Sequence, residues 1–182
     1  MRQVTKYLYQ LDNGENIEIR LLKSSDSIQQ LTRLLNRSYK SLYSMGLKYV
    51  AATQDDDTTV RRVQKAYKCF VGIINGKIVA TISLYKPSHS TASNWYSQDF
   101  VAKFGQFAVL PGLQKIGIGR KLMNIVEHEA SKIANVKELA LDTAETAYHL
   151  IDYYTKRGYI YIETVSWSQT NYRSVILSKE VI

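Results

Sequence analysis

The feature that most constrains the fold is a pair of glycines, Gly117 and Gly119, placed directly before a long stretch of helical periodicity. The stretch covers residues 117–134, and its apolar positions recur three and four residues apart: Ile118, Leu122, Ile125, Val126, Ala130 and Ile133. A helix N-terminus presents unpaired backbone N–H groups and the positive end of the helix dipole, and glycines let a phosphate approach them. Lys115 and Arg120 add positive charge at this point. The segment suits a phosphate, although two glycines can also simply shape a strand-to-helix turn.

The two common nucleotide-binding loops fit this segment poorly. A Walker loop has Lys and then Ser or Thr after its last glycine, whereas Arg120 and Lys121 follow Gly119. A dinucleotide-binding loop has a third glycine near Met123 and an acidic residue at the end of the next strand. Asp142 could supply the acid, but the third glycine is missing.

Turn signals and periodicity place the other elements. Asn13-Gly14 and Asn75-Gly76 favour positive φ angles and predict two hairpins, with strands over residues 4–11, 16–22, 69–74 and 77–85. Helices are predicted over residues 25–38, 42–49, 58–67 and 144–157, the first of them capped by Asp26 or Ser27. Further strands are predicted over residues 104–109, 136–142, 159–165 and 172–179, and residues 88–98 are interpreted as a loop. This order predicts an α/β fold, with a mixed α+β sheet and helices on both faces.

Length and composition indicate one ordinary globular domain over residues 1–182. The hydrophobic fraction of 45% and the charged fraction of 22% exclude a disordered chain, a collagen-like repeat and a minimal disulfide scaffold. The formal charge of +8 suits an anionic partner, which could be a phosphorylated small molecule, a nucleic acid or an acidic surface. The single cysteine, Cys69, gives no disulfide, zinc or redox pattern, so no metal site is expected. No run approaches the roughly 18 apolar residues of a membrane span. The first residues lack the apolar stretch of a secretory signal, so we expect a cytoplasmic protein.

The pattern Val-x-Pro-x-x-Gln-x-x-Gly-x-Gly at residues 109–119 resembles the acetyl-CoA signature of the GNAT family of N-acetyltransferases. The resemblance continues through residues 139–145, 150–159 and 170–179. It implies a single-domain fold with a mostly antiparallel central sheet, splayed where the strand holding residues 107–109 leaves the strand at residues 137–142. Acetyl-CoA would be the cofactor, with its pantetheine arm in that gap and its pyrophosphate at residues 114–120. The implied cofactor-binding residues are Phe107, Ala108, Val109, Gln114, Lys115, Ile116, Gly117, Ile118, Gly119 and Arg120.

Tyr154 is the candidate general acid. It shares a helix face with Leu150 and Ile151, so spacing alone is also compatible with a core aromatic residue. The family commonly has a tyrosine four residues before the glycine that corresponds to Gly158, and Tyr154 occupies this position. A phenol beside the departing sulfur can give it a proton or a hydrogen bond. Ala147 stands where the family often has Asn, which puts a cofactor contact by that side chain in doubt.

The general base is less well defined. Many members of the family carry an acidic residue at the position of Gln106, and glutamine cannot accept a proton. Glu145 and His149 follow the neighbouring predicted strand and are the base candidates, although either could be an ordinary helix-start or surface residue. The acidic run Asp55 to Asp57 could attract a cationic amine, or it could be a solvated helix start.

The sequence thus predicts an N-acetyltransferase that transfers the acetyl group of acetyl-CoA directly to a primary amine of a small molecule or a protein. Cys69 lies outside the matched motif, which disfavours a covalent acetyl-cysteine route. One alternative is a catalytically inactive CoA-binding sensor of the same fold, motivated by Gln106 and Ala147. A basic nucleic-acid-binding module is the other alternative, but the basic residues are spread along the chain and match no known motif. The acceptor and the oligomeric state, a homodimer included, stay open.

Overall fold

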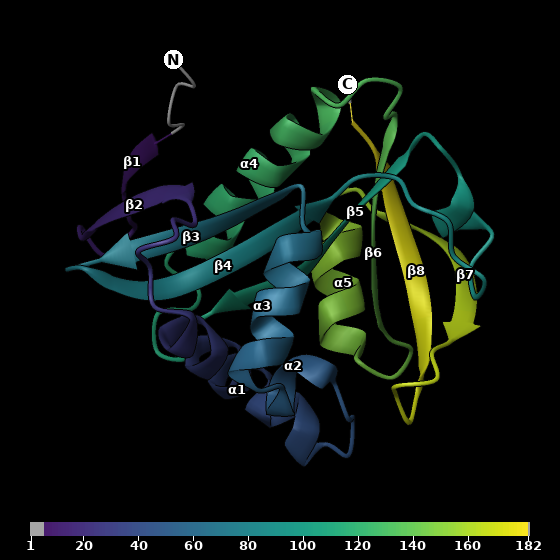
Figure 1. Cartoon of the computed structure of the whole chain (residues 1–182), viewed down its shortest axis with the longest axis horizontal. Helices are drawn as coiled ribbons and strands as arrows, with labels where there is room; N and C mark the ends of the chain where they lie inside the picture. Colours follow the sequence, from purple (N-terminus) through teal and green to yellow (C-terminus); the bar gives the residue numbers. More distant parts are fainter. Residues whose placement is uncertain (1–5, 182) are drawn as a thin grey trace.

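The computed structural model describes residues 6–181, and the first two predicted strand residues, 4 and 5, lie outside this range. Figure 1 shows the chain as one sheet flanked by helices. The strands are β1 (Lys6–Gln10), β2 (Asn16–Leu21), β3 (Lys68–Ile74), β4 (Lys77–Tyr85), β5 (Val101–Val109), β6 (Glu138–Ala144), β7 (Ile160–Ser166) and β8 (Arg173–Glu180). The helices are α1 (Ile28–Ser44), α2 (Val50–Thr53), α3 (Asp56–Lys65), α4 (Ile118–Ser131) and α5 (Tyr148–Lys156), with a 3₁₀ turn at Trp95–Ser97.

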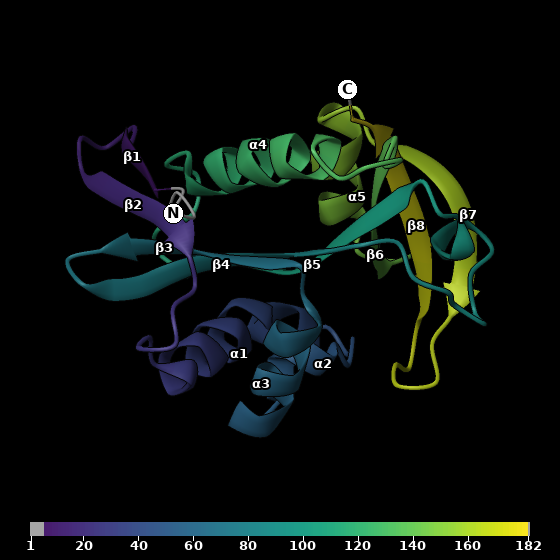
Figure 2. The ribbon, with the colours of Figure 1, turned by 45° about the horizontal axis from the view of Figure 1, so that its top comes forward.

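The eight strands form one sheet in the order β1-β2-β3-β4-β5-β6-β8-β7. Every neighbouring pair is antiparallel except β5 with β6, which is parallel. Helices α4 and α5 cover one face of the sheet, and α1, α2 and α3 cover the other (Figure 2). The predicted mixed, mostly antiparallel sheet with helices on both faces is confirmed.

The sheet splits where β5 runs beside β6. These strands pair only at Val101–Glu138, Ala102–Leu139 and Lys103–Ala140, so the second half of β5 has no ladder to β6. On its other edge, β5 pairs with β4 through an irregularity near Gln106, whose φ of 48° is left-handed. Such a bulge bends a strand and increases its twist. The predicted splay between residues 107–109 and β6 is therefore confirmed.

The first helical region differs from the prediction. A helix over residues 25–38 and a separate one over residues 42–49 were expected, whereas α1 runs without a break from Ile28 to Ser44. Leu42 explains the difference, because it continues the buried stripe of Leu31 and Leu35 for another two turns. The chain leaves the helix through Gly46, the residue after the C-cap Met45, whose φ of 83° suits a glycine. Only the short α2 follows.

Two other boundaries differ for identifiable reasons. Helix α3 begins earlier than expected because the Asp55 carboxylate caps it, accepting a hydrogen bond from the Thr58 amide at 2.8 Å. Helix α5 begins at Tyr148 rather than at residue 144, because β6 continues to Ala144, which pairs with Ser174 of β8. The predicted hairpin turns at Asn13-Gly14 and Asn75-Gly76 are confirmed.

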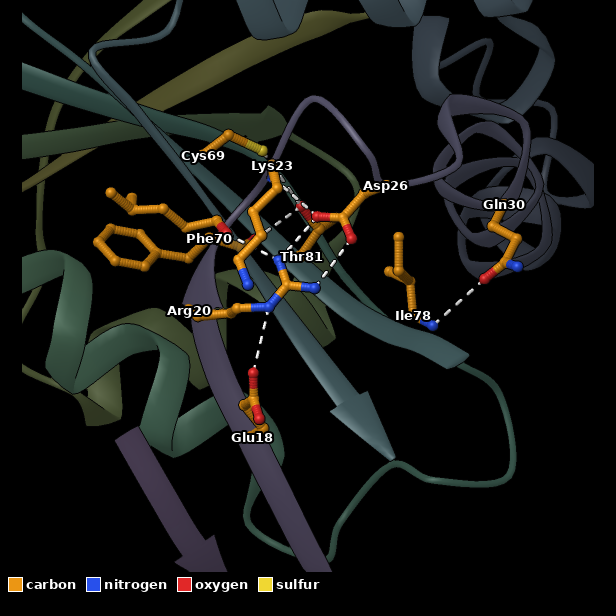
Figure 3. Close-up of polar contacts among 10 residues, drawn as sticks. Glu18, Arg20, Lys23, Asp26, Gln30, Cys69, Phe70, Ile78 and Thr81 are labelled. Atoms are coloured by element: carbon orange, nitrogen blue, oxygen red, sulfur yellow. Dashed lines mark hydrogen bonds and ion pairs between the residues drawn. The ribbon is translucent and has the colours of Figure 1, made fainter. Parts of the chain in front are cut away.

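A partly buried ion pair fixes the connection between β2 and α1. Figure 3 shows the Arg20 guanidinium between Glu18 and Asp26, with both its terminal nitrogens on the Asp26 carboxylate at 2.7 and 2.8 Å. The hydrogen bond from Arg20 holds the pKa of Asp26 below its usual value. Ser27 caps α1 by accepting a hydrogen bond from the Gln30 amide, so Ser27, not Asp26, is the cap. Among residues 6–181, no helix is long and apolar enough to cross a membrane.

Candidate active site

A groove of about 410 Å³ lies at the split in the sheet. Strand β5 supplies Phe107, Ala108 and Val109 to its wall, the loop and first turn of α4 supply Gln114, Lys115 and Gly119, and α1 and α5 close its sides. The Tyr39 hydroxyl of α1 donates a hydrogen bond to the Phe107 carbonyl at 3.0 Å. The groove therefore brings together the expected pantetheine and pyrophosphate segments.

The start of α4 has the geometry that a bound phosphate needs. Gly117 precedes the helix with a φ of 92°, and the first intrahelical bond runs from the Lys121 amide to the Gly117 carbonyl. The amides of the first turn therefore lack an acceptor within the helix. A Cβ at Gly119 would come within 3.3 Å of the Phe107 ring, so the groove is shaped around a bare backbone. These residues fit a pyrophosphate group.

The expected cofactor-binding residues divide into those that face the groove and those that do not. The Ile118 side chain is buried in the core and Ile116 packs against it, so both could contact a cofactor only through their backbone. Arg120 is exposed and lies 3.4 Å from the exposed Asp12 carboxylate of the first hairpin turn. Its charge is therefore already balanced in part.

Tyr154 lies on α5 at the inner wall of the groove and is 7% exposed. Its ring packs against Phe104 of β5 and against Tyr159. Burial raises the pKa of Tyr154 well above its ordinary value, so the phenol keeps its proton at neutral pH. Within the described part of the chain, no residue hydrogen-bonds to the Tyr154 hydroxyl, which leaves this hydroxyl available to a ligand.

A second hollow, named the acceptor cleft for the role that we propose for it, lies nearer the N-terminal end of β5. Phe104 and Gly105 line the cleft, whereas the residues after Gln106 line the groove, so the two hollows follow one another on the same strand. The cleft measures about 550 Å³. Its other walls are Val50, Thr58, Arg61, Arg62, Lys65, Tyr85, Tyr96, Lys103, Asp142 and Gln169.

Asp142 is the carboxylate of the acceptor cleft, and the sequence did not single it out as a base candidate. The Tyr96 hydroxyl donates a hydrogen bond to one oxygen at 3.1 Å, and the Trp167 indole N–H donates to the other at 3.0 Å. Although water reaches the carboxylate through the cleft, the surrounding protein raises the pKa of Asp142, and the bonds from Tyr96 and Trp167 oppose this rise. The sequence does place Asp142 at the end of the predicted strand over residues 136–142. That position indicates a site only once the structure shows that β5 and β6 part just before it.

Gln106 links side chains at the wall of the cleft by hydrogen bonds. Its side-chain oxygen accepts a hydrogen bond from Gln54 at 3.2 Å, and Gln54 in turn accepts one from Arg62 at 2.9 Å. The Gln106 amide nitrogen lies 3.4 Å from the Tyr85 hydroxyl. These uncharged side chains hold Arg62 at the wall of the cleft.

The two base candidates from the sequence lie apart from the acceptor cleft. Glu145 forms a two-pronged ion pair with Arg173, at 2.7 and 2.9 Å, and lines neither hollow. His149 lies on the wall of the groove, on the expected cofactor side of β5. The acidic run contributes a helix cap through Asp55 and does not line the cleft. In the part of the chain described here, no cluster of His, Cys, Asp or Glu could hold a metal ion.

Comparison with known proteins agrees with this architecture. The Acetyltransferase (GNAT) family model matches residues 28–159, which is more than half of the chain. S-(2-succino)cysteine N-acetyltransferase of Bacillus subtilis (strain 168) is 31% identical over 136 residues, covering 72% of this chain and 78% of that protein.

Solved structures show the same fold. The GNAT domain of S. lividans PAT superposes with a TM-score of 0.70 at 15% identity, covering 96% of each chain. An acetyltransferase from Streptococcus agalactiae 2603 gives a TM-score of 0.68 at 20% identity, covering 90% of this chain and 98% of that one. The resemblance predicted from residues 109–119 is confirmed, and the chain belongs to the GNAT family of acetyltransferases.

Proposed function

We propose that the protein is an N-acetyltransferase that moves the acetyl group of acetyl-CoA directly to the primary amine of a small molecule. The observation that carries this proposal is the split between β5 and β6, because a groove with free helix-start amides lies at the split and a cleft with one carboxylate follows it along β5. The Bacillus subtilis relative, by its name an N-acetyltransferase of S-(2-succino)cysteine, supports a small-molecule acceptor.

Residues of the groove would hold the cofactor. The free amides at the start of α4 would bind the pyrophosphate with Gln114 and Lys115, and the unpaired edge of β5 at Phe107 to Val109 would pair with the pantetheine arm. Bound acetyl-CoA would supply a thioester, whose acyl carbon is open to attack by an amine and whose sulfur leaves as a thiol. Gly119 keeps the approach to these amides clear.

Asp142 would prepare the acceptor. An amine is protonated at neutral pH and must lose a proton before it can attack, so a proton acceptor is needed within hydrogen-bond reach or one water away. We assign this role to Asp142, in preference to Glu145 and His149, because it is the carboxylate of the cleft and its two donors hold it in a fixed orientation. The raised pKa also makes Asp142 a stronger proton acceptor than an ordinary surface carboxylate.

Tyr154 would complete the transfer from the other side of β5. Its buried phenol keeps a proton that it can give to the departing sulfur. Cys69 takes no part in this scheme, since its thiol lies buried on β3, away from the groove and the acceptor cleft, and burial raises its pKa. We therefore propose that the amine attacks the thioester directly, without an acetylated cysteine as an intermediate.

The test combines cofactor binding with product formation. Acetyl-CoA is titrated into the protein by calorimetry, and CoA thiol release is then followed with S-(2-succino)cysteine, spermidine and glutamate as acceptors, with mass spectrometry of the products. Tyr154→Phe is compared with Tyr148→Phe, the same change at a tyrosine of α5 that is 73% exposed and lines neither hollow. We expect cofactor binding, one N-acetylated product per thiol, and loss of turnover only in Tyr154→Phe. Absent binding at millimolar acetyl-CoA would refute the proposal, and binding without turnover on any amine would favour the inactive sensor.

A further inference from the structure

The acceptor cleft is lined by cations that have no acidic partner. Arg61, Arg62 and Lys65 approach it from α3, and Lys103 approaches from β5. A neighbouring hollow of about 480 Å³ shares Lys65 and Lys103 and adds Lys86. Among residues 6–181 none of these five cations forms an ion pair. Asp142 is the single carboxylate of the cleft, so the cleft carries excess positive charge.

Arg62 is held in place without being neutralised. Its guanidinium donates a hydrogen bond to the side-chain oxygen of Gln54, and Gln54 is anchored in turn by Gln106 and by Thr59 at 2.7 Å. All of these partners are uncharged. An acidic side chain at position 106 would place a negative charge on this chain and cancel much of the field of Arg62. The glutamine therefore preserves a fixed and unpaired guanidinium, which is a suitable donor for a carboxylate.

Lys103 is the second cation placed for an anionic ligand. Its ammonium donates to the Ser88 hydroxyl at 2.8 Å and lies 4.9 Å from the centre of the Tyr96 ring, next to Asp142. Burial lowers the pKa of Lys103, and the charge of Asp142 opposes this effect. A bound carboxylate would stabilise the charged ammonium further.

Resting on the proposed function, we propose that the acceptor is a small amino acid with two or more carboxylates, which bind Arg62 and Lys103 while its amino group faces Asp142. The opposed charges define the orientation, because the amine is attracted to the one anion of the cleft and the carboxylates are repelled by it. The volume of about 550 Å³ is in the range of small-molecule sites. A polyamine would meet four like charges in the same space.

The test uses a matched pair of ligands that differ in one charge. S-carboxymethyl-L-cysteine and its side-chain amide, S-carbamoylmethyl-L-cysteine, are titrated by calorimetry into the protein saturated with CoA. We expect the acid to bind about ten- to a hundredfold more tightly than the amide, as a charge-assisted hydrogen bond predicts. Equal binding of the two ligands, or tighter binding of the amide or of spermidine, would overturn the proposal.

Two variants connect the preference to Arg62. Arg62→Met and Gln106→Glu should each reduce the acid-to-amide ratio to below about threefold, the first by removing the charge and the second by neutralising it. Arg33→Met is the matched control, since Arg33 is an exposed cation of α1 outside both hollows, and it should keep the full ratio. Thermal unfolding identifies any variant that fails to fold. In that case the ratio of the affinities of the wild-type protein for the acid and the amide still tests the proposal. An unchanged ratio in a folded Arg62→Met protein would contradict the assignment of Arg62.

The binding readout separates this inference from the proposed function. Tight binding of the acid without CoA thiol release would support the inference and refute the proposed activity. Acetylation of spermidine with no preference for the acid over the amide would support the proposed activity and refute the inference about the acceptor.

Discussion

Replacing Asp142 by Asn tests the assignment of the base with little structural disturbance. The Asn oxygen can accept the hydrogen bond of Trp167, and its amino group can donate to the Tyr96 hydroxyl, which accepts as well as donates. The free energy of unfolding at pH 7 should therefore change by less than about 1 kcal/mol. Loss of a positioned general base should lower kcat by about 10² to 10⁴, which corresponds to about 3 to 5 kcal/mol in the activation free energy.

The pH dependence gives the decisive assay. Because the surrounding protein raises the pKa of Asp142, the wild-type rate should fall as the pH drops through a value above that of an ordinary aspartate. CoA thiol release is measured from pH 4 to pH 9 for both proteins, together with the Kd of acetyl-CoA. We expect the acid limb to disappear in Asp142→Asn while the Kd stays within about twofold, since the carboxylate lies outside the groove. An undiminished kcat, or an acid limb that persists in the variant, would refute this reasoning.

Three further predictions concern the groove and the fold. Gly119→Val should raise the Kd of acetyl-CoA by more than about tenfold, because its side chain would crowd the Phe107 ring, whereas Arg120→Ala should change it by less than about threefold, because its charge is exposed; calorimetry measures both. Tyr154→Phe should lower kcat by about ten- to a thousandfold with little change in the cofactor Kd, and an unchanged kcat would leave Tyr154 as a core aromatic residue. Arg20→Met should lower the free energy of unfolding at pH 7 by about 2 to 4 kcal/mol, because it leaves a carboxylate that is only 12% exposed without its partner. Since the folded-state pKa of Asp26 is lowered, the contribution of this pair is present above the unfolded pKa and is lost as the pH falls through the folded one; urea unfolding in mild acid should therefore show a smaller difference between the two proteins, and an equal difference at both pH values would contradict the ion-pair explanation.

Much of the fold follows from local sequence signals. The Asn-Gly turns fix both hairpins, and the three-and-four spacing after Gly117 places α4 within three residues of its observed end. Errors occur where tertiary contacts decide the boundary. The break expected near residue 40 is absent because Leu42 is buried against the N-terminal part of α5, and such burial has no local signature. Pairing with β8 likewise extends β6 over residues that alone resemble a helix start.

The site was predictable on the cofactor side only. Glycines, a proline and a glutamine at fixed spacing describe a loop next to a helix start, so the groove residues Gln114, Lys115 and Gly119 could be expected from neighbouring positions. The acceptor cleft instead combines Arg62 of α3, Lys103 of β5 and Asp142 of β6, which are distant in the sequence. The parallel alignment of β5 with β6 brings Lys103 and Asp142 together, and the packing of α3 on the same face of the sheet adds Arg62.

A crystal structure of the protein with CoA and S-carboxymethyl-L-cysteine tests the central claim most directly. We expect the CoA sulfur in the gap between β5 and β6 beside the Tyr154 hydroxyl, and the amino nitrogen at about 2.6 to 3.2 Å from an Asp142 oxygen on the other side of β5. The ligand carboxylates should lie against Arg62 and Lys103. A CoA molecule bound away from residues 107–120, or an amino group directed away from Asp142, would contradict the account.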